Sequence, residues 1–180
     1  SGNSTKTTTM TALSFNSFTK KIYIKTNMEK IYWAWCTAEG ITSWFLSKAT
    51  YISPEGHPKA AHHKIAEGDS YIWEWHNWDG QEKGTVTKAN GTDFFEITFA
   101  NVCKVSVSLE DCGHDILLTL KQYHIPTDDN SKLNIHYGCS NGWTFWLANL
   151  KAYLEYGILL NETQNDLRHQ PLAGFEFVNI

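Results

Sequence analysis

Residues 138–157, near the C-terminus, are the most informative segment about the fold. Their sequence is GCSNGWTFWLANLKAYLEYG. Its apolar side chains recur at intervals of three and four residues, the spacing of one face of an α-helix. The side chains on this face are Trp143, Trp146, Leu147, Leu150, Tyr153 and Leu154. Ser140 or Asn141 can cap the start of such a helix, and Gly157 can end it. The stretch predicts one long amphipathic helix over residues 141–157.

The residues before this helix follow a different period, in which apolar and polar side chains alternate as in antiparallel β-strands. In residues 70–76, Tyr71, Trp73 and Trp75 fall on one face. The other runs with this alternation are 82–89, 93–99, 102–109 and 116–122. A turn is predicted from Asn77 to Gly80 after the first run, with Asp79-Gly80 as a hairpin signal. A polar loop from Pro126 to about Asn134 then leads to the helix. These runs predict a meander of antiparallel strands. Each strand has one apolar face that is buried (the dry face) and one polar face that is exposed to solvent (the wet face).

Upstream of the meander, residues 18–25 alternate as a strand, and Asn27 can cap a helix that carries Ile31 and Trp35 on one face. Gly40 is expected to break this helix. Two short runs follow, a helical piece over 41–46 and a strand over 48–53. The order is therefore a strand, two short helices, about six strands and one long helix. Helices segregated to one face of an antiparallel sheet make the predicted fold class α+β.

Length and charge limit the kind of protein. The chain has 180 residues with 15 Lys+Arg against 19 Asp+Glu, a net charge of −4. We expect one domain over 16–160, a flexible N-terminal segment over 1–15 and a C-terminal tail over 161–180 that packs on the domain. The mild acidity argues against a nucleic-acid partner, and no apolar run reaches the roughly 20 residues of a membrane span.

The cysteines indicate the compartment. Cys36, Cys103, Cys112 and Cys139 are widely spaced, with no C-x-x-C pair that would suggest zinc. Free, reduced thiols and a cytoplasmic location are the expectation. The histidines of the 54–68 loop lack acidic or cysteine ligands at helical spacing, so the sequence predicts neither a metal site nor a cofactor.

Together these elements resemble the helix-grip superfamily, which includes START lipid-transfer domains, the birch-pollen allergen type and SRPBCC proteins. Within it, the chain is similar to the family related to the C-terminal domain of the activator of the heat-shock-protein-ninety ATPase. The resemblance spans roughly residues 18–158. The residues that carry it are Ile31–Trp35, Trp44-Phe45, Tyr71-Ile72-Trp73, Gly84-Thr85-Val86, residues 105–113 and 117–122, Gly142-Trp143 and Leu154-Glu155. The family commonly has prolines before the first helix, where this chain has Thr26-Asn27-Met28.

The resemblance implies a helix-grip fold, in which a curved antiparallel sheet grips the long C-terminal helix and leaves a cavity between them. Aromatic residues make up 14% of the chain, including 8 Trp, and many fall on the dry faces. These rings either line a ligand pocket or fill the space themselves. The candidate lining residues are Trp44, Phe45, Trp73, Trp75, Phe95, Ile97, Leu118, Gln122, Trp143, Trp146 and Leu150.

Polar side chains add little evidence for catalysis. Gln122 either accepts a hydrogen bond from a buried tryptophan N–H or reaches water at its strand end. Glu74, Glu96 and Glu110 occupy strand positions expected to face water. The sequence contains neither a G-x-S-x-G elbow nor a phosphate-binding glycine loop, so we expect no catalytic residue.

The sequence therefore predicts a binding protein and not an enzyme, with a hydrophobic or aromatic small molecule held between the sheet and the helix. One alternative is a protein-interaction domain of the chaperone-regulator type, with a chaperone or another protein as its partner. A second is a small hydrolase or cyclase that uses the cavity.

Overall fold

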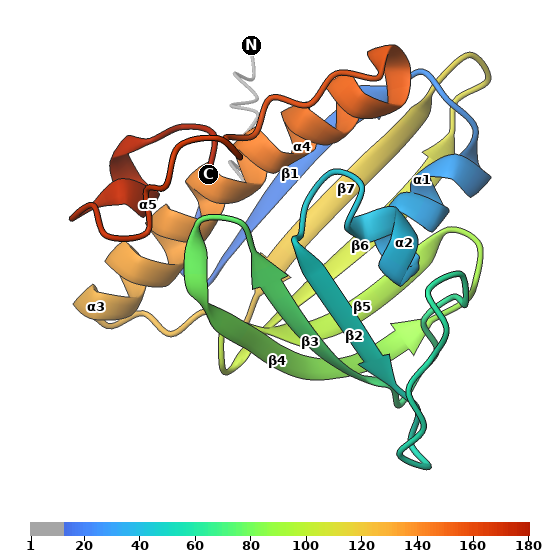
Figure 1. The fold of residues 1–180 in the computed structure, drawn as a ribbon, viewed down its shortest axis with the longest axis horizontal. Helices are drawn as coiled ribbons and strands as arrows, with labels where there is room; N and C mark the ends of the chain where they lie inside the picture. The colour runs from blue at the N-terminus through green and yellow to red at the C-terminus, as the bar shows by residue number, and fades with distance from the viewer. Residues whose placement is uncertain (1–12) are drawn as a thin grey trace, which may run out of the picture.

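The computed structural model describes residues 13–180, so most of the predicted N-terminal segment 1–15 lies outside it. Seven strands form one antiparallel sheet in the order β1-β7-β6-β5-β4-β3-β2. The strands are β1 Ser17–Ile24, β2 Lys48–Ile52, β3 Ser70–Trp75, β4 Trp78–Ala89, β5 Phe94–Phe99, β6 Cys103–Asp111 and β7 Ile116–Tyr123. The helices are α1 Met28–Cys36, α2 Ala38–Ile41, α3 Asp129–Ser131, the π-helical η1 Lys132–Tyr137, α4 Gly138–Tyr156 and α5 Ala173–Glu176. The curved sheet and the long helix α4 confirm the predicted α+β helix-grip class (Figure 1).

The long helix begins earlier than its sequence predicted. The Asp128 side chain accepts a hydrogen bond from Ser131 N (3.1 Å) and caps α3, which continues through η1 into α4. The predicted loop 126–134 and the cap at Ser140 or Asn141 are therefore wrong. A polar stretch can be helical when its polar side chains face water, and Asp128 supplies the cap. The end is as predicted, because Gly157 adopts φ +69°, a left-handed conformation that favours glycine.

The first helix also ends at a different residue from the one predicted. Asn27 caps α1 as expected, accepting a hydrogen bond from Lys30 N (2.8 Å). The break falls at Thr37, whose hydroxyl oxygen accepts a hydrogen bond from Gly40 N (3.0 Å), and Gly40 lies inside α2. A Cβ atom at Gly40 would lie 1.8 Å from Trp33 O, so glycine is needed here for close packing of α2 on α1.

The first hairpin turns ahead of the predicted Asp79-Gly80 signal. β3 and β4 are joined at His76 and Asn77, while Asp79 and Gly80 belong to β4. Trp75 and Trp78 pair across the hairpin, and their ring centroids are 5.6 Å apart in an edge-to-face arrangement. This aromatic pair next to the turn favours the observed register over the Asp-Gly turn.

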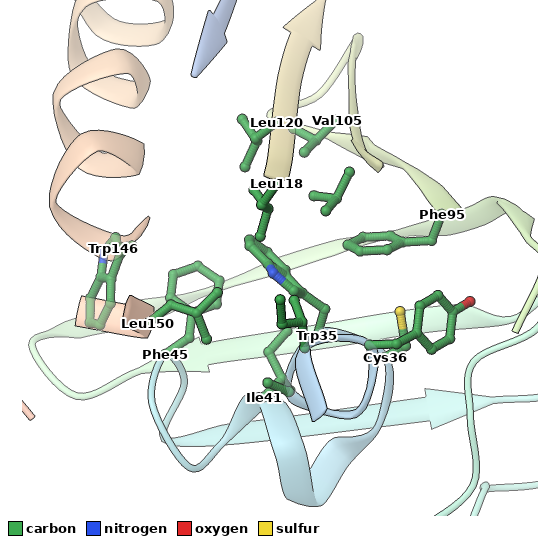
Figure 2. Packing of buried hydrophobic residues seen from close by; sticks show 14 of the residues in the cluster. Trp35, Cys36, Ile41, Phe45, Phe95, Val105, Leu118, Leu120, Trp146 and Leu150 are labelled. Atoms are coloured by element: carbon green, nitrogen blue, oxygen red, sulfur yellow. The ribbon is translucent and has the colours of Figure 1, made fainter. Parts of the chain in front are cut away.

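Aromatic side chains fill the space between α4 and the middle of the sheet (Figure 2). The Trp35 ring lies 4.9 Å from Trp44 and 5.8 Å from Trp143, and Phe45 lies 5.4 Å from Trp143, measured between ring centroids. All four side chains are at most 3% exposed. The centre of the predicted cavity is therefore a solid core.

One predicted surface residue is buried. Glu96 is only 6% exposed, although it lies on the strand face expected to be wet. The hydroxyls of Tyr123 and Thr87 and the ammonium group of Lys104 donate hydrogen bonds to its carboxylate. Burial works to raise the pKa of Glu96, but these bonds outweigh it and lower the pKa overall. Alternation identified the face correctly, but it could not show that long cross-strand side chains cover the carboxylate.

Candidate functional site

An open pocket of about 660 Å³ lies at one end of the fold, away from the filled centre. We call residues 161–180 the strap and this cavity the strap pocket. Its walls come from the β3–β4 hairpin, the end of β5, α4 and the strap, which doubles back beside α4 (Figure 1). Its apolar lining includes Trp75, Trp78, Phe99, Trp146, Leu167 and Phe175. Its polar lining includes His76, Asn77, Glu82, Asn134, Cys139 and Arg168.

A smaller pocket of about 120 Å³ lies beside the strap pocket, on the side of the core. Trp75, Phe99, Cys139 and Trp146 contribute to both cavities. The inner pocket is completed by Phe45, Gly142 and Trp143. The two cavities therefore adjoin, and side chains leave both of them open.

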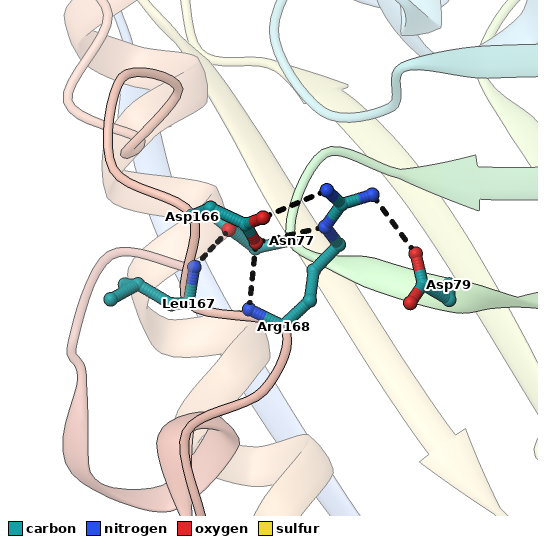
Figure 3. A network of polar contacts seen from close by, with 5 residues as sticks. All are labelled: Asn77, Asp79, Asp166, Leu167 and Arg168. Carbon is teal, nitrogen blue, oxygen red and sulfur yellow. Dashed lines mark hydrogen bonds and ion pairs between the residues drawn. The ribbon is translucent and has the colours of Figure 1, made fainter.

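The strap is held to the β3–β4 turn by the side chain of Asn77 (Figure 3). Asn77 Oδ1 accepts a hydrogen bond from Leu167 N (2.9 Å), and Asn77 Nδ2 donates one to Glu162 O (3.0 Å). Arg168 of the strap donates to Asp166 (2.8 Å) and to Asp79 on β4 (3.0 Å). One amide side chain thus satisfies two backbone groups of the strap.

We expect Asn77→Ala to loosen the strap. The loss of two hydrogen bonds, at about 1 kcal/mol net each, should increase strap opening by about tenfold or more. Arg168 is the one Lys or Arg in residues 161–180, so trypsin should release residues 169–180 correspondingly faster. The measurement is mass spectrometry of a digestion time course. Asn165→Ala is the control, and an unchanged cleavage rate in Asn77→Ala would contradict the role of Asn77.

Glu82 places a carboxylate on the inner face of β4. It pairs across the ladder with Trp73, whose side chain is buried in the core, and it is itself half-buried. Its Oε1 atom accepts a hydrogen bond from Ala100 N (2.9 Å). Burial raises the pKa of Glu82 above its ordinary value, and this hydrogen bond only partly opposes the increase.

Cys139 and Trp143 line the inner end of the site, and Gln122 lies behind Trp143 in the core. Trp143 Nε1 donates a hydrogen bond to Gln122 Oε1 (2.9 Å), and Gln122 is completely buried. The alternative in which Gln122 reaches water is therefore wrong, because α4 covers this end of β7. Burial raises the pKa of the Cys139 thiol to about 11, so the group is protonated and neutral at pH 7.

The structure divides the predicted lining residues into three groups. Trp75 and Trp146 line both pockets. Phe45 and Trp143 line the inner pocket alone. The rest line neither cavity and pack in the core: Trp44, Trp73, Phe95, Ile97, Leu118, Gln122 and Leu150. Because aromatic rings fill the centre of the predicted cavity, the observed cavities lie near the ends of β3 and β5.

Sequence reasoning missed Glu82, Asn77 and the strap residues. Glu82 had a usable signal, because the alternation within β4 places it on the same face as Val86, which is fully buried. Asn77 and Arg168 had none, since their roles depend on where the strap returns to the domain. Within residues 13–180 no group of three or more metal-binding side chains is present, and no helix is long and apolar enough to cross a membrane.

Comparison with known proteins identifies the relatives of this fold. A family model described as "Activator of Hsp90 ATPase homolog 1-like protein" matches residues 25–155. No curated protein matches the sequence. Protein SSP2350 from Staphylococcus saprophyticus has a similar structure, with a TM-score of 0.64 and 16% identity over 80% of this chain and 95% of that one.

Two further solved structures are similar. The Aha1 dimer from Colwellia psychrerythraea has a TM-score of 0.61 and 21% identity over 78% of this chain and 97% of that chain. DynU16, a protein of the dynemicin biosynthetic locus, has a TM-score of 0.59 and 16% identity over 79% of this chain and 48% of that chain. At these identities the likeness shows a shared fold alone.

Proposed function

The chain belongs to the family of activator of Hsp90 ATPase homolog 1-like proteins, and from this membership and the strap pocket we propose that it binds a hydrophobic small molecule. The observation that carries the proposal is an open cavity of about 660 Å³ with aromatic walls. Ligand sites in proteins are typically concave, mostly apolar and roughly 300–1,000 Å³ in volume. The same fold in DynU16, from a biosynthetic locus, is compatible with a small-molecule ligand.

The aromatic walls favour a flat apolar ligand. Trp75, Phe99 and Trp146 each line both the strap pocket and the inner pocket. Rings of this kind interact with a flat molecule by stacking or edge-to-face contact, beyond the gain from buried area. Asn77 and Arg168 hold the strap over one side, where its Leu167 and Phe175 add apolar area.

Within this proposal the pocket binds its ligand without chemical conversion. A cysteine nucleophile reacts as the thiolate, and burial keeps the Cys139 thiol protonated at pH 7. Glu82 lies in the same pocket, but its hydrogen-bond partner is the backbone N–H of Ala100 and not a nucleophilic side chain. These features support binding over hydrolysis or cyclisation.

A role as a protein-interaction domain is the second candidate function. Four large apolar side chains, Tyr156, Ile158, Leu159 and Leu160, are exposed in succession around the end of α4. Large exposed apolar side chains that are this close in sequence suggest a protein contact site. This candidate would gain support if the strap pocket failed to bind any apolar probe.

Trp75→Leu tests the pocket because Trp75 lines both cavities and is only half-buried. We expect wild-type protein to bind the neutral probe N-phenyl-1-naphthylamine with enhanced probe fluorescence. The variant should bind about tenfold more weakly, because it loses about 1–1.5 kcal/mol of aromatic contact. Trp33→Leu is the matched control, since Trp33 is also half-buried and its Nε1 bonds Glu39 away from both pockets. Equal affinity in Trp75→Leu and wild type would contradict the proposed site.

A further inference from the structure

We infer that the ligand of the strap pocket carries a positive charge, as an amine or quaternary ammonium group on a flat apolar body, and that Glu82 receives this charge. The inference rests on the proposed function and specifies the class of ligand. Three observations carry it: the position of Glu82, the neutralisation of the pocket's arginine, and the aromatic rings that line the same cavity as the carboxylate.

Glu82 is a pocket carboxylate without a cationic partner. It accepts a hydrogen bond from Ala100 N, and no ion pair joins it to any Lys, Arg or His among residues 13–180. Glu82 lies on the inner face of the sheet, as the cross-strand neighbour of the buried Trp73. This position removes part of the water that would otherwise solvate its charge. Burial accordingly raises its pKa. A cation bound in the pocket would stabilise the ionised carboxylate that burial now destabilises.

The other charged groups of the pocket are already engaged. Arg168 is the one Lys or Arg in its lining, and the carboxylates of Asp166 and Asp79 lie 2.8 and 3.0 Å from its guanidinium group. The Glu162 carboxylate accepts hydrogen bonds from the backbone N–H groups of Gln164 and Asn165 within the strap. These hydrogen bonds lower the pKa of Glu162, so its negative charge is stabilised within the strap, whereas burial raises the pKa of Glu82. The charge that the protein leaves least stabilised is therefore that of Glu82, and it is negative.

The rings of the pocket suit a cation as well as an apolar body. Trp75, Trp78, Phe99 and Trp146 line the same cavity as Glu82, and the first two are in edge-to-face contact at 5.6 Å. The face of an indole or phenyl ring carries negative potential and attracts an ammonium group. Aromatic faces combined with one carboxylate favour an alkylammonium ion over an anion, which Glu82 would repel, or a neutral group, which would leave its charge unpaired.

The experiment compares probes of one shape and different charge. The three are trimethyl(2-naphthylmethyl)ammonium, its neutral carbon isostere 2-neopentylnaphthalene, and the anion 2-naphthylmethanesulfonate. We expect wild-type protein to bind the ammonium probe about tenfold or more tightly than the isostere, and the sulfonate most weakly. In Glu82→Gln the ammonium affinity should fall about tenfold, while the isostere stays within about twofold of wild type.

The design separates folding and the proposed function from the inference. Glu82→Gln keeps the shape and an oxygen acceptor for Ala100 N, and the ranking of the three probes on wild-type protein does not depend on any variant. Glu74→Gln is the matched control. It also removes one carboxylate charge, but from the neighbouring strand β3 and from the face of the sheet that points away from the pocket. If the isostere binds as tightly as the ammonium probe, the inference is overturned and the proposed function stands. If no probe binds, both are overturned.

Discussion

Replacing Trp143 by alanine is expected to lower the free energy of unfolding by about 3–5 kcal/mol, the range for truncating a buried aromatic side chain. Trp143 is 3% exposed, and its ring contacts Trp35, Phe45 and Phe99 at centroid distances of 5.4–5.8 Å. Its Nε1 also donates the hydrogen bond to Gln122, so truncation leaves a buried amide oxygen without its partner. The rings around it come from α1, the turn after α2 and β5, and these parts of the chain cannot all close on the gap.

Urea unfolding followed by circular dichroism measures this loss. The control is Trp33→Ala, which truncates a half-buried tryptophan on α1 and should cost about 1 kcal/mol or less. A loss in Trp143→Ala no larger than in Trp33→Ala would show that the rings do not form a packed core. The cavity left by Trp143 would adjoin the inner pocket, so the same variant should gain room for the neutral naphthalene probe if it remains folded.

Asn149→Leu is expected to lower the free energy of unfolding by about 2–3 kcal/mol through two unpaired backbone groups. Asn149 is completely buried on α4, although its neighbours on that face are apolar. Its Nδ2 donates to Trp44 O (2.7 Å), and its Oδ1 accepts from Leu160 N (2.7 Å). Leucine has the same branching and the same number of side-chain heavy atoms, but it can satisfy neither group.

Thermal and urea unfolding of Asn149→Leu should be compared with those of Asn161→Leu. Asn161 is only partly buried, and its side chain meets Asn149 Nδ2 at 3.3 Å, so its loss should cost less than about 1 kcal/mol. Equal stability of Asn149→Leu and wild type would mean that the Trp44 carbonyl and the Leu160 amide find other partners. Because Leu160 leads into the strap, the variant should also expose Arg168 to trypsin.

The architecture was well predicted because the spacing of apolar residues follows directly from the backbone geometry of a helix or a strand. The change from alternation in 102–122 to helical spacing at Trp143, Trp146 and Leu150 located the sheet and the helix correctly. Boundaries were less accurate, because they depend on contacts distant in sequence. Asp79-Gly80 has the composition of a turn, but the Trp75–Trp78 pair fixes the register so that both residues fall in a strand.

The site was less predictable than the fold. Alternation correctly placed Trp73 and Phe95 on the inner face, but it carries no information on whether neighbouring rings fill the space beside them. That depends on rotamers and on how closely Phe45 and Trp143 approach. The strap pocket depends on the return path of residues 161–180, which no local pattern specifies.

The strap gives the pocket a property that a rigid cavity lacks. Part of its wall is a chain segment held by Asn77 and Asn149, so the complete site exists only in the fraction of molecules in which that segment is docked. The apparent dissociation constant therefore equals the intrinsic constant divided by that fraction. By thermodynamic linkage, a ligand in the pocket must in turn increase the fraction of molecules in which the strap is docked. Protection of the Arg168–His169 bond from cleavage thus reports pocket occupancy, whatever the chemical identity of the bound molecule.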